Sequence, residues 1–260
     1  MLNNKTALVT GSTSGIGLGI AKALAKQGAN LILNGFGEYA EAKTEVEAAG
    51  AAFDIKVGYH GADMSKPADI EAMMVYATTE FGGVDILVNN AGIQHVSPIE
   101  TFPTEKWDAV IAINLSSAFH TTRLAIPSMR AKNWGRIINI ASAHGLVASA
   151  NKTAYVAAKH GIVGLTKAVA LEVATTGVTV NAICPGWVLT PLVQAQIDTR
   201  ATNEKITVEQ ATKELLGEKE PSLQFTTTEQ LGGMAVFMCS PAADNVRGVA
   251  WANDGGWTAQ

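Results

Sequence analysis

Tyr155 and Lys159 are the pair whose residue types and spacing most directly suggest chemistry in this sequence. They are four positions apart, so on a helix they lie on one face. An unperturbed phenol titrates near ~10, too high for a base at neutral pH, but a nearby ammonium stabilises the phenolate and lowers that pKa. Ser142 lies upstream at the end of an apolar run, where its hydroxyl could hold a reacting oxygen. The set predicts acid–base catalysis at an alcohol or carbonyl oxygen, whereas the Tyr–Lys pair alone would more often be a surface pair.

A glycine-rich turn follows the first apolar run of the chain, and reads Thr10-Gly11-Ser12-Thr13-Ser14-Gly15-Ile16-Gly17. Gly11 permits a tight turn, Gly15 lets backbone N–H groups approach a pyrophosphate, and Gly17 allows close packing of helix on strand. The order of strand, turn and helix favours a dinucleotide site over the alternative, an ordinary strand-to-helix turn.

The spacing Thr-Gly-x-x-x-Gly-Ile-Gly resembles that of the short-chain dehydrogenase/reductase family, and the resemblance extends over the whole chain. Asn89-Asn90-Ala91-Gly92 and Pro185-Gly186 match two further motifs of the family, in the same order. The resemblance implies an enzyme that moves a hydride between a nicotinamide dinucleotide and a hydroxy or keto substrate. It also implies four catalytic residues, with Asn114 supporting a water chain: Asn114, Ser142, Tyr155 and Lys159.

The same resemblance supplies the expected cofactor contacts, among them an acid that meets the adenine amino group. They are Gly11, Thr13, Gly15, Ile16, Gly17, Phe36, Asp63, Asn90, Ala91, Gly92, Tyr155, Lys159, Pro185, Gly186 and Val188.

The choice between NAD and NADP depends on the end of the second apolar run, Leu33-Asn34-Gly35-Phe36-Gly37, which has neither an acid nor a base. Ser14 stands where members that use the phosphorylated cofactor often carry a basic residue. Burying a 2′-phosphate without a cation is costly, so NAD is expected. Phe36 is expected beside the adenosine, with core packing as an equal alternative.

Four polar residues could converge on a substrate carboxylate: Gln94, His144, Lys152 and Gln196. Each taken singly would more often be a solvated or structural residue. The surrounding segments resemble those of one group in the family, the bacterial D-3-hydroxybutyrate dehydrogenases, in which the matching residues hold that carboxylate. The resemblance implies that Trp187 packs on the short alkyl end of the substrate, while Trp257 completes the environment of a neighbouring subunit. The expected substrate-binding set is Gln94, Ser142, His144, Lys152, Tyr155, Trp187 and Gln196.

The expected reaction is therefore the NAD-dependent, reversible oxidation of (R)-3-hydroxybutyrate to acetoacetate. A short-chain reductase for a 3-oxoacyl thioester or a polyol is the nearest alternative. A catalytically silent NAD-binding regulator is an alternative of another class, for which a complete catalytic set would be hard to explain.

Seven short apolar runs, each followed by a helical pattern, would position these residues. Such an alternation predicts a parallel sheet covered on both faces, so the expected fold is α/β, a doubly wound seven-stranded, Rossmann-like sheet. We expect one domain over residues 1–260, with a helical substrate lid at about 190–228 on the carboxyl edge of the sheet. The runs are 7–9, 31–33, 55–57, 86–88, 137–140, 178–180 and 249–251.

Composition narrows the possible partners. The net charge is −4, the pI is about 5.7, and no Lys/Arg run occurs, which argues against nucleic acid. The stretch 173–197 has no charged residue, but its glycine and prolines argue against a membrane helix. A 47% hydrophobic and 16% charged chain suggests covered surface, and the family resemblance implies a homotetramer. Cys184 and Cys239 read as buried thiols in a reducing cytoplasm, and no metal-ligand spacing occurs.

Overall fold

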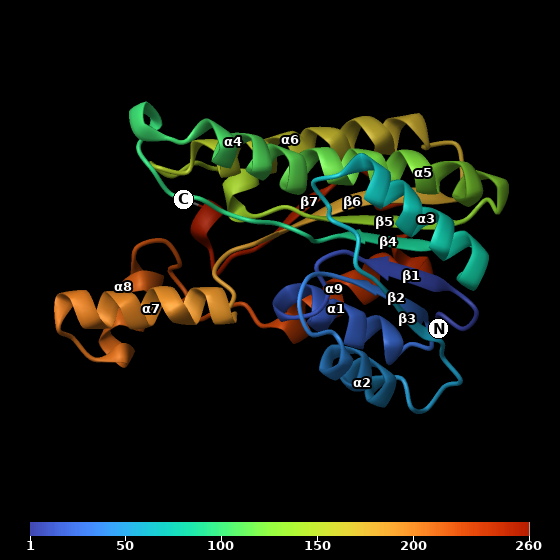
Figure 1. Cartoon of the computed structure of the whole chain (residues 1–260), viewed down its shortest axis with the longest axis horizontal. Coiled ribbons are helices and arrows are strands. Elements are labelled where there is room, and N and C mark those ends of the chain that lie inside the picture. The colour runs from blue at the N-terminus through green and yellow to red at the C-terminus, as the bar shows by residue number, and fades with distance from the viewer. Residues whose placement is uncertain (260) are drawn as a thin grey trace.

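A seven-stranded parallel sheet forms the centre of the computed structural model, which describes residues 1–259 (Figure 1). The strand order is β3-β2-β1-β4-β5-β6-β7, and every neighbouring pair runs parallel. The predicted doubly wound fold is therefore confirmed. The strands are β1 (Thr6–Val9), β2 (Asn30–Asn34), β3 (Val57–His60), β4 (Ile86–Asn89), β5 (Gly135–Ile140), β6 (Val178–Pro185) and β7 (Ala250–Asn253).

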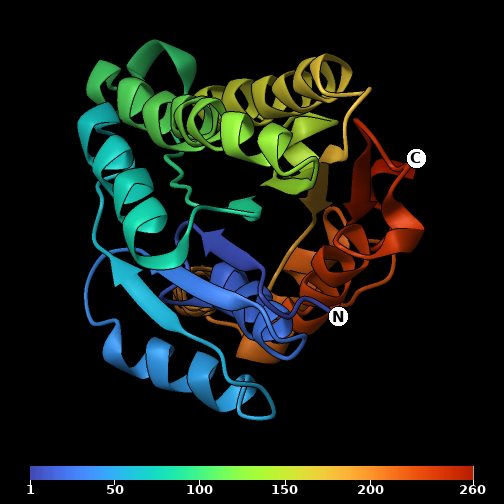
Figure 2. The ribbon, with the colours of Figure 1, turned by 90° about the vertical axis from the view of Figure 1, so that its right-hand side faces the viewer.

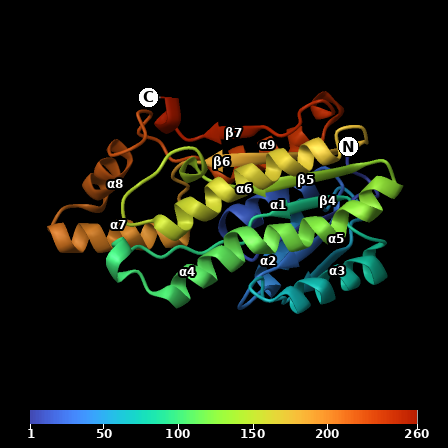
Figure 3. The same cartoon turned by 90° about the horizontal axis from the view of Figure 1, so that it is seen from above.

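Helices cover both faces of this sheet, which is why the central strands are buried along their whole length (Figures 1 and 2). One face carries α1 (Gly15–Ala25), α2 (Ala40–Ala49) and α9 (Thr228–Met238), and Ala7 and Val9 pack there. Leu8 points to the opposite face, as the alternation of a strand requires. That second layer, seen from above in Figure 3, contains α3 (Pro67–Phe81), α4 (Thr104–Ile111), α5 (Ser117–Ala131) and α6 (Thr153–Glu172).

The third strand lies two residues beyond its expected position. The expected run was 55–57, whereas β3 spans Val57–His60, paired with Leu31–Asn34 of β2. Ile55 instead packs beside Gly50 at the end of α2, so its apolar side chain belongs to the connection and not to the strand.

Two helices of the predicted lid segment, α7 (Pro191–Glu204) and α8 (Val208–Gly217), extend from the carboxyl edge of the sheet (Figure 1). Thr190 caps α7 by accepting from the backbone N–H of Val193, and a proline follows at the first helical position. Arg200 of α7 joins the two helices through Glu214 and Glu218, and also pairs with Glu204 on its own helix. Their packing against each other gives the segment its own small apolar cluster, which includes Val193, Ile197, Ala201 and Ala211.

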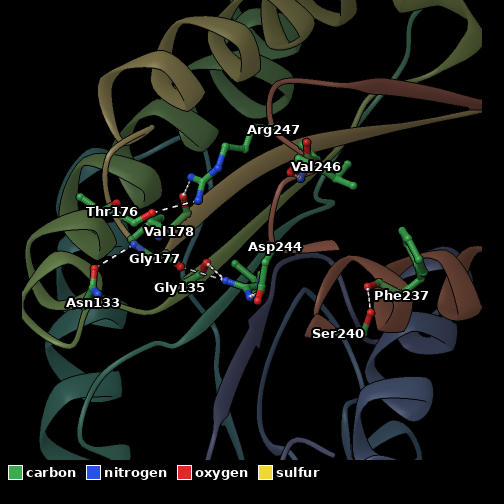
Figure 4. Close-up of polar contacts among 12 residues, drawn as sticks. Asn133, Gly135, Thr176, Gly177, Val178, Phe237, Ser240, Asp244, Val246 and Arg247 are labelled. Atoms are coloured by element: carbon green, nitrogen blue, oxygen red, sulfur yellow. Dashed lines mark hydrogen bonds and ion pairs between the residues drawn. The ribbon is translucent and has the colours of Figure 1, made fainter. Parts of the chain in front are cut away.

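Polar contacts fix the opposite, amino edge of the sheet (Figure 4). Arg247 donates to the carbonyl oxygens of Thr176 and Val178, at 3.0 and 2.6 Å. The side-chain oxygen of Asn133 accepts from the backbone N–H of Gly177 at 2.8 Å. These contacts fix the start of β6, on the side of the sheet away from the predicted site.

None of the helices in residues 1–259 has the length and apolarity needed to cross a membrane.

Candidate active site

A cavity of about 570 Å³ opens at the carboxyl edge of the sheet, where β1 and β4 are neighbours. The connections from these two strands leave in opposite directions along the sheet, and ligands of doubly wound folds bind at such a point. Most predicted cofactor residues line it: Gly11, Thr13, Gly15, Ile16, Phe36, Asn90, Ala91, Gly92, Tyr155, Lys159, Pro185 and Gly186. So do the predicted catalytic residues Asn114 and Ser142, and Gln94 from the substrate set.

The glycine-rich turn has the geometry that a pyrophosphate requires. Gly11 and Gly15 have φ values of 62° and 54°, in the left-handed region that favours glycine. A Cβ on Gly17 would lie 2.2 Å from the carbonyl oxygen of Gly11, so this glycine is needed for packing. A Cβ on Gly15 would meet nothing nearer than Thr190, at 3.4 Å, so the backbone there is open to the cavity. The N-terminus of α1 therefore offers free N–H groups to an anion.

Asn34 is a structural residue of this turn that the sequence reasoning treated only as a missing charge. Its side-chain oxygen accepts from the backbone N–H of Gly11 at 3.3 Å, and its amide donates to the carbonyl oxygens of His60 and Ala62. Asn90 donates to the carbonyl oxygens of Thr10 and Gly11 at 2.9 and 2.8 Å. The side chain of Asn34, at the end of β2, thus links the glycine-rich turn to the end of β3 and the connection after it.

Phe36 is 68% exposed and lines the cavity, so the alternative of core packing is wrong. Lys159 is the one charged residue in the cavity wall as the structure describes it, and it lies at the catalytic end. The end of β2 therefore carries no cation for a phosphate.

Three of the predicted cofactor residues, Gly17, Asp63 and Val188, lie behind the cavity wall. Asp63 accepts from the backbone and the hydroxyl of Ser65, and these hydrogen bonds lower its pKa. Its neighbours Ala62 and Met64 reach the wall instead. Val188 is buried and bridges to Thr226 at the base of the α7–α8 segment.

Tyr155 and Lys159 come from the first two turns of α6, as their spacing predicted. The Lys159 ammonium donates to the carbonyl oxygen of Ile140 at 2.7 Å and lies 5.5 Å from the centroid of the Tyr155 ring. Burial lowers the pKa of Lys159 to about 8, which leaves it mainly cationic at neutral pH. Ser142 follows β5 and is nearly buried beside them.

The pKa of Tyr155 departs from the expected direction. Burial raises it above the ordinary value, and the interaction with Ser142 opposes this only in part. Desolvation of the phenolate therefore decides the direction of this pKa. Tyr155 is therefore protonated in the protein alone, and further positive charge at the site is needed to draw its proton away.

Asn114 occupies a π-helical turn, Ala112–Ser116, between α4 and α5. Such turns occur often at functional sites. Its amide donates to the carbonyl oxygens of Ile93 and Val110, at 2.9 and 3.0 Å. Its side-chain oxygen is buried, faces Gly92 and has no partner in the described part of the chain. A free acceptor beside the catalytic residues fits the predicted role in holding a water.

Three of the predicted substrate residues, His144, Lys152 and Trp187, are grouped next to Tyr155 but outside the cavity wall. The His144 ring lies 5.9 Å from that of Tyr155, and the Lys152 ammonium lies 5.3 Å from the Trp187 ring. Burial, with the charge of Lys152 second, lowers the pKa of His144 to about 4, so the imidazole is neutral. A neutral donor and a cation thus flank the catalytic phenol.

Gln196 is the predicted substrate residue that the structure does not bring to this group. It lies exposed on α7, which extends away from the sheet. Trp257, which is expected to serve a neighbouring subunit, contacts the site of its own chain. Trp257 is 8% exposed, and its ring packs edge-on against His144 at 4.9 Å.

Glu220 is a residue at the site that sequence reasoning missed. Its carboxyl is fully buried, and one oxygen accepts from the backbone N–H of Trp187. The other oxygen has no partner among the described residues. Burial, aided by the carboxylate of Asp254, raises the pKa of Glu220 to about 7. The hydrogen bond from Trp187 to Glu220 connects the end of the α7–α8 segment to the turn at Pro185-Gly186. In the sequence it looks like one more acid in a charged stretch.

The raised pKa of Glu220 predicts a specific pH dependence of stability. Because its folded pKa exceeds the unfolded value, its contribution is full below pH ~4.5 and is lost as pH rises through 7. We expect Glu220→Gln, whose amide oxygen can still accept from Trp187, to be more stable than wild type at pH 8 by up to about 3 kcal/mol. The difference should shrink toward pH 5 in thermal melts.

Glu218→Gln is the matched control, because Glu218 is exposed and paired with Arg200. It should give a small difference without the same pH trend. A constant difference between wild type and Glu220→Gln from pH 5 to 8 would show that Glu220 is ionised throughout.

The model of the short chain dehydrogenase family matches residues 5–201. The D-beta-hydroxybutyrate dehydrogenase of Cupriavidus necator is 70% identical over 260 residues, which is the whole of both chains. Its namesake in Rhizobium meliloti is 57% identical and covers 98% of this chain and 99% of its own. Among solved structures, levodione reductase superposes with a TM-score of 0.91 at 31% identity, covering 100% and 99% of the two chains. A variant of actinorhodin polyketide ketoreductase with NADPH gives 0.90 at 33% identity, covering both chains fully.

The matched segment contains the glycine-rich turn, the four predicted catalytic residues and the strands that carry them. The strand order of the sheet, the cavity at its carboxyl edge and the sequence match over the whole chain all agree with membership of this family. This chain belongs to the short-chain dehydrogenase family and is an oxidoreductase.

Proposed function

We propose that this enzyme uses NAD to oxidise (R)-3-hydroxybutyrate reversibly to acetoacetate. The observation that carries the proposal is the placement of Lys152, His144 and Trp187 beside Tyr155. A cation and a neutral imidazole suit a carboxylate, and the indole suits a short alkyl group. The names of the relatives from Cupriavidus necator and Rhizobium meliloti support the same substrate.

In the proposed mechanism, Tyr155 takes the proton of the substrate hydroxyl and returns it in the reverse direction. Ser142 donates a hydrogen bond to the reacting oxygen and holds it beside the phenol. The bound nicotinamide supplies the hydride acceptor and, in its oxidised form, a positive charge. Lys159 adds a second positive charge 5.5 Å from the phenol ring, and the two charges together would oppose the effect of burial on the Tyr155 pKa. Asn114 holds a water at its free oxygen, through which the proton reaches solvent.

The cofactor is a nicotinamide dinucleotide, and we propose NAD. The side chain of Asn34 is already engaged in hydrogen bonds to backbone groups. Phe36 is exposed, and Ser14 lies in the cavity wall. Together they leave the ribose 2′ position without a cation.

The segment 190–228 would close over the bound ligands as a lid.

Phe36→Arg is expected to shift the preference toward NADP. The exposed position can accept an arginine without disturbing the core, and a guanidinium pairs well with a phosphate. We expect kcat/KM for NADP to rise about tenfold or more, measured by absorbance of the reduced cofactor. Phe36→Leu serves as the control for loss of the ring. An equal gain in Phe36→Leu would mean that phosphate pairing is not the cause.

A reductase for a 3-oxoacyl thioester or a polyol is the nearest alternative to the proposed reaction, whereas a silent NAD-binding regulator does not agree with the oxidoreductase family of this chain. The complete set of Ser142, Tyr155 and Lys159 favours turnover over silent binding. Lys152 favours a free acid over a neutral substrate, because a thioester would leave the lysine without a counter-charge.

We also propose that the enzyme is a cytoplasmic homotetramer. Both cysteines are free and buried, as suits a reducing compartment. Phe119 and Leu171 are 49% and 79% exposed on α5 and α6, and such apolar side chains suit a subunit interface. Sedimentation of the purified protein tests the assembly.

The reaction is tested by absorbance of the reduced cofactor with (R)-3-hydroxybutyrate, its (S)-enantiomer and a 3-hydroxybutyryl thioester, each with NAD and with NADP. We expect rapid turnover of the (R)-acid with NAD. Turnover of the thioester alone would retain the catalytic residues and contradict the substrate. Cofactor binding without any turnover would favour the regulator.

A further inference from the structure

Lys219 is a lysine of the predicted lid that lies close to the substrate residues. It follows α8, where its backbone N–H donates to the carbonyl oxygen of Leu216 at 3.0 Å. Its side chain is half-buried, and the ammonium lies 5.8 Å from the centroid of the Trp257 ring. The Trp257 ring lies 4.9 Å from His144, which lies 5.9 Å from Tyr155. A continuous series of contacts therefore leads from Lys219 to the catalytic phenol.

The charges around Lys219 are not balanced. Within the described residues, neither Lys219 nor Lys152 has a carboxylate at salt-bridge distance. The acids on either side of Lys219 are already engaged: Glu218 with Arg200, and Glu220 with the backbone of Trp187. After burial, the charge of Lys219 is the next cause that lowers the pKa of Lys152, and the charge of Glu218 opposes it. Two half-buried cations without a salt-bridge partner, both close to His144, favour an anion between them.

We propose that Lys219 is a second cationic residue for the substrate carboxylate, supplied by the lid, and that it acts with Lys152 to select acids over neutral alcohols. This inference rests on the proposed function, because it concerns the same carboxylate. Lys152 begins the catalytic helix, whereas Lys219 belongs to the lid segment. Binding of the carboxylate by both lysines would therefore tie the lid segment to the catalytic helix, as the contact of Lys219 with Trp257 beside His144 allows.

The test compares Lys219→Met and Lys219→Arg with Lys213→Met, a matched control on the exposed side of α8. We expect Lys219→Met to raise KM for (R)-3-hydroxybutyrate about five- to tenfold and leave kcat within about twofold. Its KM for the methyl ester should not change, and Lys219→Arg should restore most of the loss. Equal KM values for the acid in Lys219→Met and Lys213→Met would overturn the proposal.

Acetate affinity, measured by tryptophan fluorescence of the enzyme, separates this proposal from the proposed function. We expect Lys219→Met to weaken acetate binding by the same factor as KM, whichever alcohol the enzyme oxidises. If wild type does not oxidise the acid but Lys219→Met still weakens acetate binding, the reaction is wrong and the anion site stands. If wild type oxidises the acid but acetate binds both proteins equally, the reaction stands and Lys219 is not part of the site.

Discussion

Replacing Tyr155 with phenylalanine is expected to lower kcat by about 10³-fold or more, because it removes the group that exchanges a proton with the substrate oxygen. The ring would remain packed against His144, and Lys159 would keep its hydrogen bond to the carbonyl oxygen of Ile140. NADH should therefore still bind, with an affinity that falls by no more than the loss of one hydrogen bond, measured by fluorescence of the reduced cofactor.

Tyr76→Phe is the matched control for this variant, since it also removes a phenol hydroxyl. Tyr76 lies on α3, where it packs against His60 and Phe81, outside the cavity wall. Tyr76→Phe should leave kcat within about twofold of wild type. Residual activity in Tyr155→Phe above about one tenth of wild type would contradict the assignment of Tyr155 as the acid–base.

Replacing Lys152 with methionine is expected to produce the second largest effect, and mainly on substrate affinity. Hydrogen bonds to charged groups contribute about 1.5–3 kcal/mol, which corresponds to a rise in KM of about 10- to 150-fold for (R)-3-hydroxybutyrate. The methionine side chain can still pack against the Trp187 ring, so the loss should come from charge and not from packing.

The same measurement with Lys106→Met, an exposed lysine on α4, shows what loss of any surface charge does. NAD affinity should not change in either variant. If Lys152→Met oxidises the free acid with unchanged KM, Lys152 does not hold the carboxylate.

The sequence was sufficient to predict the sheet and the proximity of Tyr155, Lys159 and Ser142. The apolar runs correspond to six of the strands as placed, and only β3 lies further along the chain, because Ile55 packs on the α2 connection. Tyr155 and Lys159 share a helix face and meet Ser142 at the end of β5, since helix periodicity and strand ends are local properties.

Residues whose role depends on distant contacts were not visible in the sequence. Glu220 is one acid among several in a charged stretch until the fold buries it under Trp187. From the sequence, Asn34 shows only that the end of β2 has no charged residue. Its structural role depends on hydrogen bonds to Gly11, His60 and Ala62, which are distant in sequence. The direction of the Tyr155 pKa also depends on burial, which spacing alone does not give.

The most direct test of the proposed function compares kcat/KM of the wild-type enzyme for (R)-3-hydroxybutyrate and for its methyl ester, with NAD, by absorbance of NADH. The two compounds share the reacting alcohol and differ in the charge that Lys152 would recognise. The site predicts that the acid is preferred by about 100-fold or more. Equal values, or a preference for the ester, would contradict the assignment of a carboxylate substrate.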